Sequence, residues 1–135
     1  MRGGSYPAID SRRMASGDHP VVVVADDDAS LRLLCRVNLE QDGYRVLEAA
    51  SGAEVDRALA SEPVAVALLD IRLGRDDGVA VARRMREHHP AVAVVFFTGS
   101  ARTLDDATRA LADGVIPKPF SLEELIETVQ RLAPA

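Results

Sequence analysis

The sequence predicts an α/β domain of the doubly wound (βα)5 kind, in which helices cover both faces of a five-stranded parallel sheet. From Pro20 onward, a short continuous apolar run followed by a helix with its own start signal occurs five times. Uninterrupted Val and Leu runs are typical of strands buried on both faces, which indicates a parallel sheet. The chain of 135 residues is long enough for one such domain and too short for two ordinary ones.

The expected strands are short runs between polar or turn-forming residues, which favours strands over helices. They are residues 21–25, 44–48, 64–69, 92–97 and the brief 115–116.

The helices between these strands begin at recognisable capping residues. Residues 51–54 and 121–124 fit the capping box, and residues 103–106 are a variant with Asp at the fourth place. Asp28 is expected to cap the first helix, which would end at Gly43.

Apolar stripes at helical spacing indicate which helix faces meet the sheet. In the last helix the stripe comprises Leu122, Leu125, Ile126, Val129 and Leu132. In the first helix it comprises Leu31, Leu34, Cys35 and Leu39, so Cys35 is interpreted as a small buried hydrophobe.

Composition and charge exclude several classes of protein. The longest apolar run, residues 91–97, is far shorter than the roughly 18 residues of a membrane helix. A net charge of −5 argues against nucleic acid as the main partner. A single cysteine excludes an intrachain disulfide, and the opening stretch has no apolar signal-peptide core, so we expect a cytoplasmic protein.

The first 18 residues are rich in Gly, Ser and Arg and have no apolar period, so residues 1–18 are interpreted as a flexible leader before a domain of residues 19–135. Met14 is an alternative start of the chain.

Reactive side chains follow four of the five strands. In open parallel sheets ligands bind where the carboxyl ends of the strands meet, so these side chains are expected to share one edge. They are Asp26, Asp27 and Asp28 after the first strand, Asp70 after the third, Thr98 after the fourth and Lys118 after the fifth. The second strand ends at Glu48 with no such signal.

This combination favours phosphoryl chemistry. Two carboxylates about 4 Å apart repel by roughly 4 kcal/mol at an effective dielectric constant near 20, so the acidic cluster needs cations. Lys118, the only lysine, supplies one positive charge, and an all-oxygen site suits Mg²⁺. Aspartate can act as a nucleophile that forms aspartyl phosphate, with the cations and a hydroxyl neutralising the phosphoryl oxygens.

Four segments, VVVVADDDASLRLL, VALLDIRLGRDDG, VVFFTGSA and PKPF, resemble the receiver domain of two-component response regulators. The resemblance covers about residues 20–133. It implies a flavodoxin-like sheet of order 2-1-3-4-5, and a signalling domain that acts only on its own side chain, not an enzyme with a separate substrate.

The resemblance also implies the metal site. Asp27 would bind Mg²⁺ directly and Asp26 largely through water, while Asp70 and the backbone carbonyl of Arg72 would complete the protein ligands.

Asp70 would be the phosphoacceptor, receiving its phosphoryl group from a histidine kinase or a histidine phosphotransfer protein. Thr98 and Lys118 would each bind a phosphoryl oxygen, and the Lys118–Pro119 peptide bond would be cis.

The chain departs from the family pattern at three places. Gly74-Arg75 stands where the family usually has Pro-Gly, and Val115 stands where it usually has an aromatic residue that moves on activation. The segment between Thr98 and Lys118 is slightly short, which predicts a truncated fourth helix. The phosphorylation residues are intact, whereas the usual switch is in question.

Two other functions remain open. A haloacid dehalogenase-like phosphatase needs Asp-x-Asp, but Asp70 is followed two residues later by Arg72, which cannot donate a proton at neutral pH. A receiver-like module that binds proteins without phosphorylation is favoured by Val115 and the short helix and opposed by the intact reactive residues.

The expected output is a contact with a downstream protein, or a homodimer, through the fourth helix, fifth strand and fifth helix. Glu124 and Glu127 lie on this surface. Nucleic-acid binding through this domain is not expected, because no output domain follows Ala135; the sequence fits a stand-alone receiver, a relay or a piece of a longer regulator alike.

Overall fold

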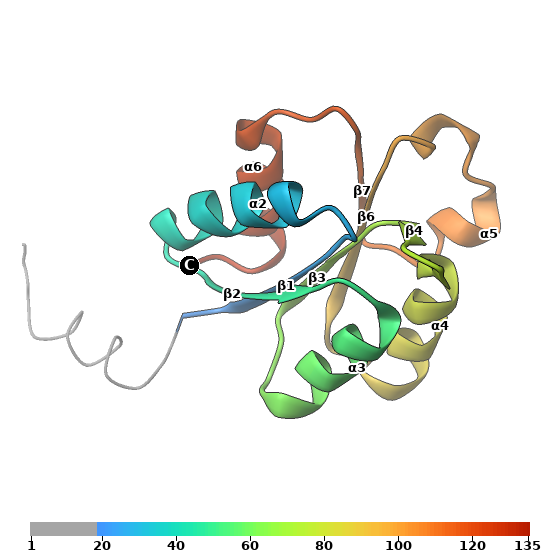
Figure 1. Ribbon diagram of the computed structural model, residues 1–135, viewed down its shortest axis with the longest axis horizontal. Coiled ribbons are helices and arrows are strands. Elements are labelled where there is room, and N and C mark those ends of the chain that lie inside the picture. Colours follow the sequence, from blue (N-terminus) through green and yellow to red (C-terminus); the bar gives the residue numbers. More distant parts are fainter. Residues whose placement is uncertain (1–18) are drawn as a thin grey trace, which may run out of the picture.

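The computed structural model describes residues 19–135, and it contains a five-stranded parallel sheet of order β2-β1-β3-β6-β7 (Figure 1). The strands are β1 (Val21–Ala25), β2 (Arg45–Ala49), β3 (Val66–Leu69), β6 (Ala93–Thr98) and β7 (Gly114–Pro117). This is the flavodoxin-like order expected from the sequence. The labels β4 and β5 belong to a small hairpin between β3 and β6. The leader predicted for residues 1–18 lies outside the described residues.

Strand boundaries differ from the predicted ones by at most two residues. The predicted run 64–69, for example, enters the sheet only at Val66, which pairs with Val22 of β1 and Ala93 of β6. The difference arises because the hydrogen-bonded ladder decides where a strand begins, whereas apolar character extends into the adjoining loop.

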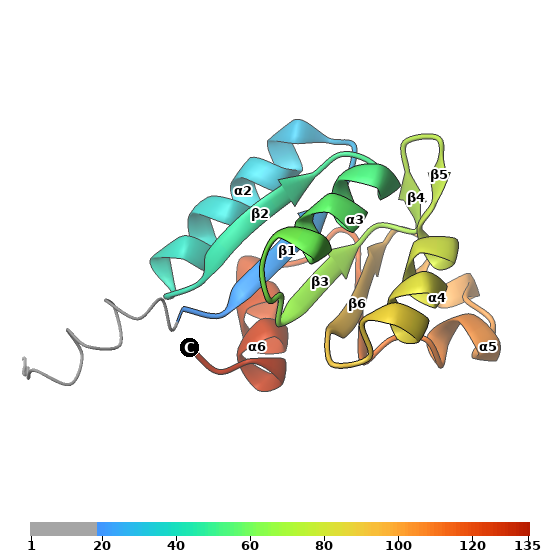
Figure 2. The same cartoon turned by 90° about the horizontal axis from the view of Figure 1, so that it is seen from below.

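Helices cover both faces of the sheet (Figure 2). The helices are α2 (Ala29–Gln41), α3 (Gly52–Ser61), α4 (Gly78–His88), α5 (Asp106–Arg109) and α6 (Leu122–Leu132), with a 3-10 turn η1 (Ala101–Thr103) before α5. One buried cluster joins α2 and α6 to the sheet, and a second joins α3 and α4 to its other face. The molecule is therefore the predicted three-layer sandwich, and none of the helices in residues 19–135 is long and apolar enough to span a bilayer.

Local capping signals predicted most helix starts correctly. The side chain of Asp28 accepts from the amides of Ser30 and Leu31, Ser51 accepts from Glu54, and Ser121 accepts from Glu124.

The predicted start at Thr103 is wrong, because residues 101–103 form η1 and the next helix begins after Asp105. The Asp105 side chain accepts from the Thr108 amide at 2.7 Å, and the Thr103 hydroxyl donates to the Ser100 carbonyl. The resulting α5 has only four residues, as the short segment before Lys118 predicts.

One member of the predicted apolar stripe of α2 is also wrong. Cys35 and Leu39 are fully buried, but Leu34 is 46% exposed. Residues 31, 35 and 39 follow each other at four-residue spacing along the sheet-facing side, while Leu34 is turned about 100° from Cys35 around the helix axis.

Candidate functional site

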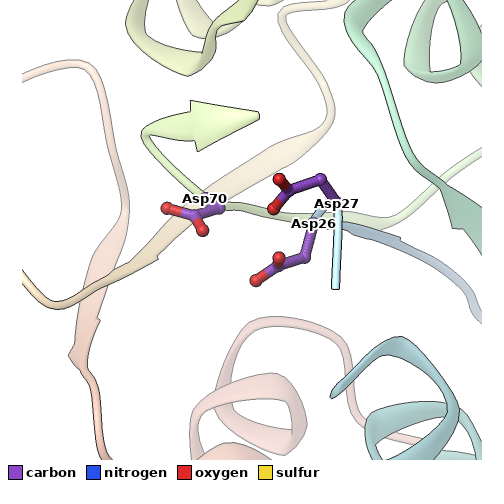
Figure 3. Close-up of side chains that lie close together, drawn as sticks. All are labelled: Asp26, Asp27 and Asp70. Carbon is purple, nitrogen blue, oxygen red and sulfur yellow. The ribbon is translucent and has the colours of Figure 1, made fainter. Parts of the chain in front are cut away.

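Three carboxylates meet at the carboxyl ends of β1 and β3 (Figure 3). These strands are neighbours with Ala25 beside Leu69, so the residues that follow them, Asp26 and Asp70, emerge side by side. One carboxylate oxygen each from Asp26, Asp27 and Asp70 lies within 4.8 Å of the others. Asp26 is 1% exposed and Asp70 9%, whereas Asp27 faces solvent. A compact group of oxygen ligands with an open side fits Mg²⁺, which keeps several of its waters.

Lys118, which directly follows the edge strand β7, brings a positive charge into this cluster. Its Nζ donates to Asp26 Oδ2 at 2.6 Å and to Asp70 Oδ2 at 2.9 Å. The ammonium also lies 4.8 Å from the ring centre of Phe97, within the range of a cation–π contact. The Lys118–Pro119 peptide bond is cis, as predicted.

Main-chain amides hold both buried carboxylates. The amide of Asp28 donates to Asp26 Oδ1 at 2.9 Å, and the amide of Arg72 donates to Asp70 Oδ1 at 3.1 Å. The resemblance implied a role for the carbonyl of Arg72, whereas this use of its amide was not predicted.

The two buried carboxylates differ in acidity although they share Lys118. Burial raises the pKa of Asp26, but Lys118 and the Asp28 amide outweigh it and hold this pKa below its usual value. Burial also raises the pKa of Asp70, and the nearby negative charge of Asp26 raises it further, so that it stays above its usual value despite Lys118. Burial lowers the pKa of Lys118, but the two carboxylates raise it above its usual value. In the metal-free chain Asp26 is thus the better stabilised anion of the pair.

Thr98 is the last residue of β6 and is 3% exposed. Its Oγ1 accepts from the amide of Ser100 at 3.1 Å, which leaves the hydroxyl proton to donate elsewhere. The amide of Lys118 donates to the carbonyl of Thr98 at 2.9 Å, so both predicted phosphoryl-binding residues stand on adjacent strand ends. Beside them lies a cleft of about 550 Å³, lined by residues 99–103 and 117–119.

The second strand also serves the site, contrary to the prediction that its end is unremarkable. Arg32 Nη1 donates to the main-chain carbonyl of Asp26 at 2.7 Å, and Arg32 Nε donates to Glu48 Oε1 at 3.1 Å. Glu48 therefore orients the guanidinium that holds the backbone of Asp26. An arginine one helical turn after the Asp28 cap was the available sequence signal, but its partner on β2 is 16 residues away.

A hairpin that was not predicted from the sequence follows Asp70 closely. It consists of β4 (Arg72–Leu73) and β5 (Asp76–Asp77), paired antiparallel around Gly74, whose φ is +63°. Strands of two residues are too short for apolar alternation to reveal them.

Comparison with protein families gives a match between residues 22–130 and the family model described as response regulator receiver domain.

Two curated relatives illustrate how much of the chain this similarity covers. The DNA-binding transcriptional regulator NtrC of Escherichia coli K12 is 36% identical over 114 residues, which are 82% of this chain and 24% of NtrC. The chain therefore spans about a quarter of the length of that relative. The response regulator receiver protein CpdR of Brucella abortus is 33% identical over 113 residues, which are 82% of this chain and 94% of CpdR.

Solved structures have the same fold. The response regulator TrrA of Thermotoga maritima, determined in complex with Mg²⁺ and BeF, superposes with a TM-score of 0.77 at 26% identity, covering 84% of this chain and 98% of that one. NtrX of Brucella abortus superposes with a TM-score of 0.78 at 28% identity, covering 84% of this chain and 27% of that one.

Proposed function

The chain belongs to the response regulator receiver domain family, and on this premise we propose that Asp70 is its phosphoacceptor. The observation that carries the proposal is the position of Asp70, a nearly buried carboxylate that shares one ammonium with Asp26 and one ligand cluster with Asp27. Few reactions need a nucleophilic carboxylate, two further carboxylates and a lysine at one strand edge, and phosphoryl transfer to aspartate is one of them.

The transfer forms one bond and breaks one. A carboxylate oxygen of Asp70 attacks the phosphorus of a phosphohistidine on the donor protein, and the new O–P bond forms as the P–N bond breaks. The imidazole nitrogen keeps the electron pair of the broken bond and takes up a proton from solvent. Attack of water on the same phosphorus later releases inorganic phosphate and restores the Asp70 carboxylate.

The neighbouring side chains would stabilise the charge of the transferred group. Lys118 would exchange one of its carboxylate contacts for a phosphoryl oxygen, and the free hydroxyl proton of Thr98 would be donated to another. Asp26 would remain in place, held by the Asp28 amide.

Mg²⁺ is the proposed cofactor, held by Asp26, Asp27, Asp70 and the backbone carbonyl of Arg72. The all-oxygen cluster supports this assignment, as does the Mg²⁺ in the TrrA complex. When bound, Mg²⁺ neutralises negative charge on the carboxylates and on the phosphoryl oxygens.

The proposed donor is a histidine kinase or a histidine phosphotransfer protein, and the proposed location is the cytoplasm, since the single cysteine, Cys35, is buried and unsuited to a disulfide. The proposed output surface comprises α5, β7 and α6, which would contact a downstream protein or a second copy of the chain. Residues 1–18 would serve as a leader to the domain of residues 19–135.

Binding without phosphorylation is the second candidate function. It is favoured by the four-residue α5 and by the half-buried Val115 in place of an aromatic residue on β7. In that case Asp70 would be phosphorylated without consequence, or not at all.

Intact mass after incubation with acetyl phosphate tests the proposal. We expect a gain of one phosphoryl group in the presence of Mg²⁺, no gain with EDTA, and no gain for Asp70→Ala. The control is Asp56→Ala, which removes an exposed carboxylate paired with Arg84 and should be phosphorylated like the wild type. A wild-type chain that neither binds Mg²⁺ nor gains mass would favour the binding module.

A further inference from the structure

The hairpin formed by β4 and β5 has few means of holding itself in place. Each of its strands has two residues, and an isolated hairpin of that length is marginally stable in water. The amide of Gly78 donates to the carbonyl of Ile71 at 2.8 Å and ties the base of the hairpin to the fold. Leu73, which directly precedes the turn and pairs with Asp76, is fully buried and holds β4. Neither contact involves a side chain of β5, whose two residues are both exposed.

The position of this hairpin matters for the carboxylate cluster. Its first residue, Arg72, donates its amide to Asp70 Oδ1 at 3.1 Å. Its turn residue, Gly74, lies against the other side of the cluster: a Cβ added to Gly74 would lie 3.8 Å from Asp27 Cβ and 3.8 Å from the carbonyl of Ala50. The hairpin is thus bonded to Asp70 and passes close to Asp27.

Asp76 links the hairpin to a different part of the fold. Its Oδ2 accepts from the amide of Gly52, the first residue of α3, at 2.7 Å. A carboxylate at the N-terminus of a helix is favoured both by the charge-assisted hydrogen bond and by the helix dipole. The approach is close, because a Cβ on Gly52 would lie 3.3 Å from Asp76 Oδ2.

The attachment point is itself well ordered by local bonds. Ser51 caps α3 by accepting from the amide of Glu54, and Glu54 Oε1 in turn accepts from the amide of Ala50 at 2.8 Å. Asp76 therefore anchors the hairpin to a capped helix start and not to a free loop.

We propose that Asp76 is a positioning residue for the phosphorylation site: its bond to the Gly52 amide holds the β4–β5 hairpin against Asp27 and keeps the Arg72 amide on Asp70. The proposal rests on the function proposed above and extends it to a residue outside the reacting group. In this chain Gly74 and Arg75 form the turn with no proline to stiffen it, so a side-chain anchor supplies the restraint.

The test compares Asp76→Ala, Asp76→Asn and Asp56→Ala with the wild type. Asparagine keeps an oxygen that can accept from Gly52 but removes the charge. Asp56→Ala removes a carboxylate that lines the same cleft as Asp76 but pairs with Arg84 of α4. Two quantities are measured without any phosphodonor: the dissociation constant for Mg²⁺ by calorimetry, and hydrogen exchange of the Arg72 amide in the metal-free chain by NMR.

For Asp76→Ala we expect Mg²⁺ binding weaker by about tenfold, as is typical when a residue that orients metal ligands is removed. Exchange of the Arg72 amide should accelerate by a similar factor. Asp76→Asn, which keeps the hydrogen bond but loses the charge, should recover part of both properties, and Asp56→Ala should match the wild type.

Wild-type Mg²⁺ affinity and exchange in Asp76→Ala would overturn the proposal. Equal weakening in Asp76→Asn and Asp76→Ala would also overturn it, since the hydrogen bond that asparagine retains would then contribute nothing. These results are separate from phosphorylation: a wild type that gains no phosphoryl group, with Asp76→Ala still altered in both measurements, would refute the proposed function and leave the positioning role supported.

Discussion

The carboxyl-terminal edge of the sheet at β1, β2 and β3, where the carboxylate cluster lies, differs sharply from the flank, the segment of residues 99–113 that connects β6 to β7. At the edge, buried charges are matched in detail: Asp26 is bonded by Lys118 and by an amide, and its carbonyl is bonded by Arg32. On the flank, the connection consists of a 3-10 turn and the four-residue α5, which has no buried residue.

The difference separates two tasks. Asp26, Asp70 and Thr98 stand at the ends of β1, β3 and β6, which have a neighbouring strand on both sides, so the core restrains their geometry. Lys118 follows β7, which pairs with β6 alone in the sheet, and is held by its bonds to Asp26 and Asp70. The surface proposed for output depends in part on a short, exposed helix. Chemistry and signalling should therefore respond to different substitutions, and the following predictions test that separation.

Removal of the Lys118 ammonium from the carboxylate cluster should have the largest effect on the rate of phosphorylation. Lys118→Ala leaves Asp26 and Asp70 without their shared cation, and phosphorylation by acetyl phosphate should slow by at least about 100-fold, as when one transition-state donor is removed elsewhere. The rate is measured by intact mass over time.

Arg102→Ala is the matched control, because Arg102 is an exposed cation that lines the cleft beside Lys118. Its rate should stay close to that of the wild type. An equal loss in both variants would mean that the cleft attracts the donor by general charge.

The space around two glycines differs between the carboxyl-terminal edge and the flank. A Cβ on Gly78 would lie 2.1 Å from the carbonyl oxygen of Asp70, whereas a Cβ on Gly99 would meet no heavy atom of residues 19–135 within 4 Å. Gly78→Ala should lower the free energy of unfolding by at least about 3 kcal/mol, the upper range for overpacking. Gly99→Ala should change it by less than about 0.5 kcal/mol.

Urea denaturation measures both glycine variants. Similar stabilities for the two would contradict the packing contrast.

The support from the second strand should have an intermediate effect. Arg32→Met keeps much of the side-chain volume but removes the bond to the Asp26 carbonyl, and Mg²⁺ binding should weaken by about tenfold. Arg45→Met, on the same strand as Glu48 but paired with Glu62, serves as the control and should bind Mg²⁺ like the wild type. Calorimetry with Mg²⁺ alone distinguishes the two.

Charge reversal on α6 should spare chemistry and weaken contacts. Glu124→Lys and Glu127→Lys alter side chains on α6, outside the carboxylate cluster. Phosphorylation should continue at the wild-type rate, while self-association of the phosphorylated chain or binding to a downstream protein should weaken severalfold. Sedimentation and intact mass are the measurements. Lost phosphorylation in either variant would contradict the assigned output surface.

Acid should loosen the flank through Asp113, with the smallest effect of the series. Burial raises the pKa of Asp113, but the Val94 amide and Arg86 outweigh it and hold the pKa below its usual value. A lowered carboxyl pKa stabilises the fold above the unfolded-state value near 3.8, and this contribution is lost as the pH falls through the lower folded-state value.

Because the Arg86–Asp113 pair is partly exposed, the stabilisation should be at most about 1 kcal/mol. Asp113→Asn should reduce the unfolding free energy near neutral pH and flatten its decline in acid, as measured by urea denaturation across pH. An unchanged acid profile would show that other carboxylates dominate there.

Much of the fold could be predicted because its signals are local. Asp28, Ser51 and Ser121 each bond an amide two or three residues away, so a short stretch of sequence contains the whole interaction. Thr103 was a misleading signal of the same kind, because the chain formed a 3-10 turn there and the helix began after the equally suitable Asp105.

The sequence by itself determined which side chains meet at the site, since parallel strands bring their carboxyl ends to one edge and the residues at those ends must lie there. That rule accounts for Asp26, Asp70, Thr98 and Lys118 once the strands are recognised. Only the tertiary structure decided how they are held. The bonds of Arg32 to Glu48 and of Asp76 to Gly52 join residues 16 and 24 positions apart. Such bonds depend on how whole elements pack against one another, and hydrophobic periodicity carries no information about which polar side chains then meet.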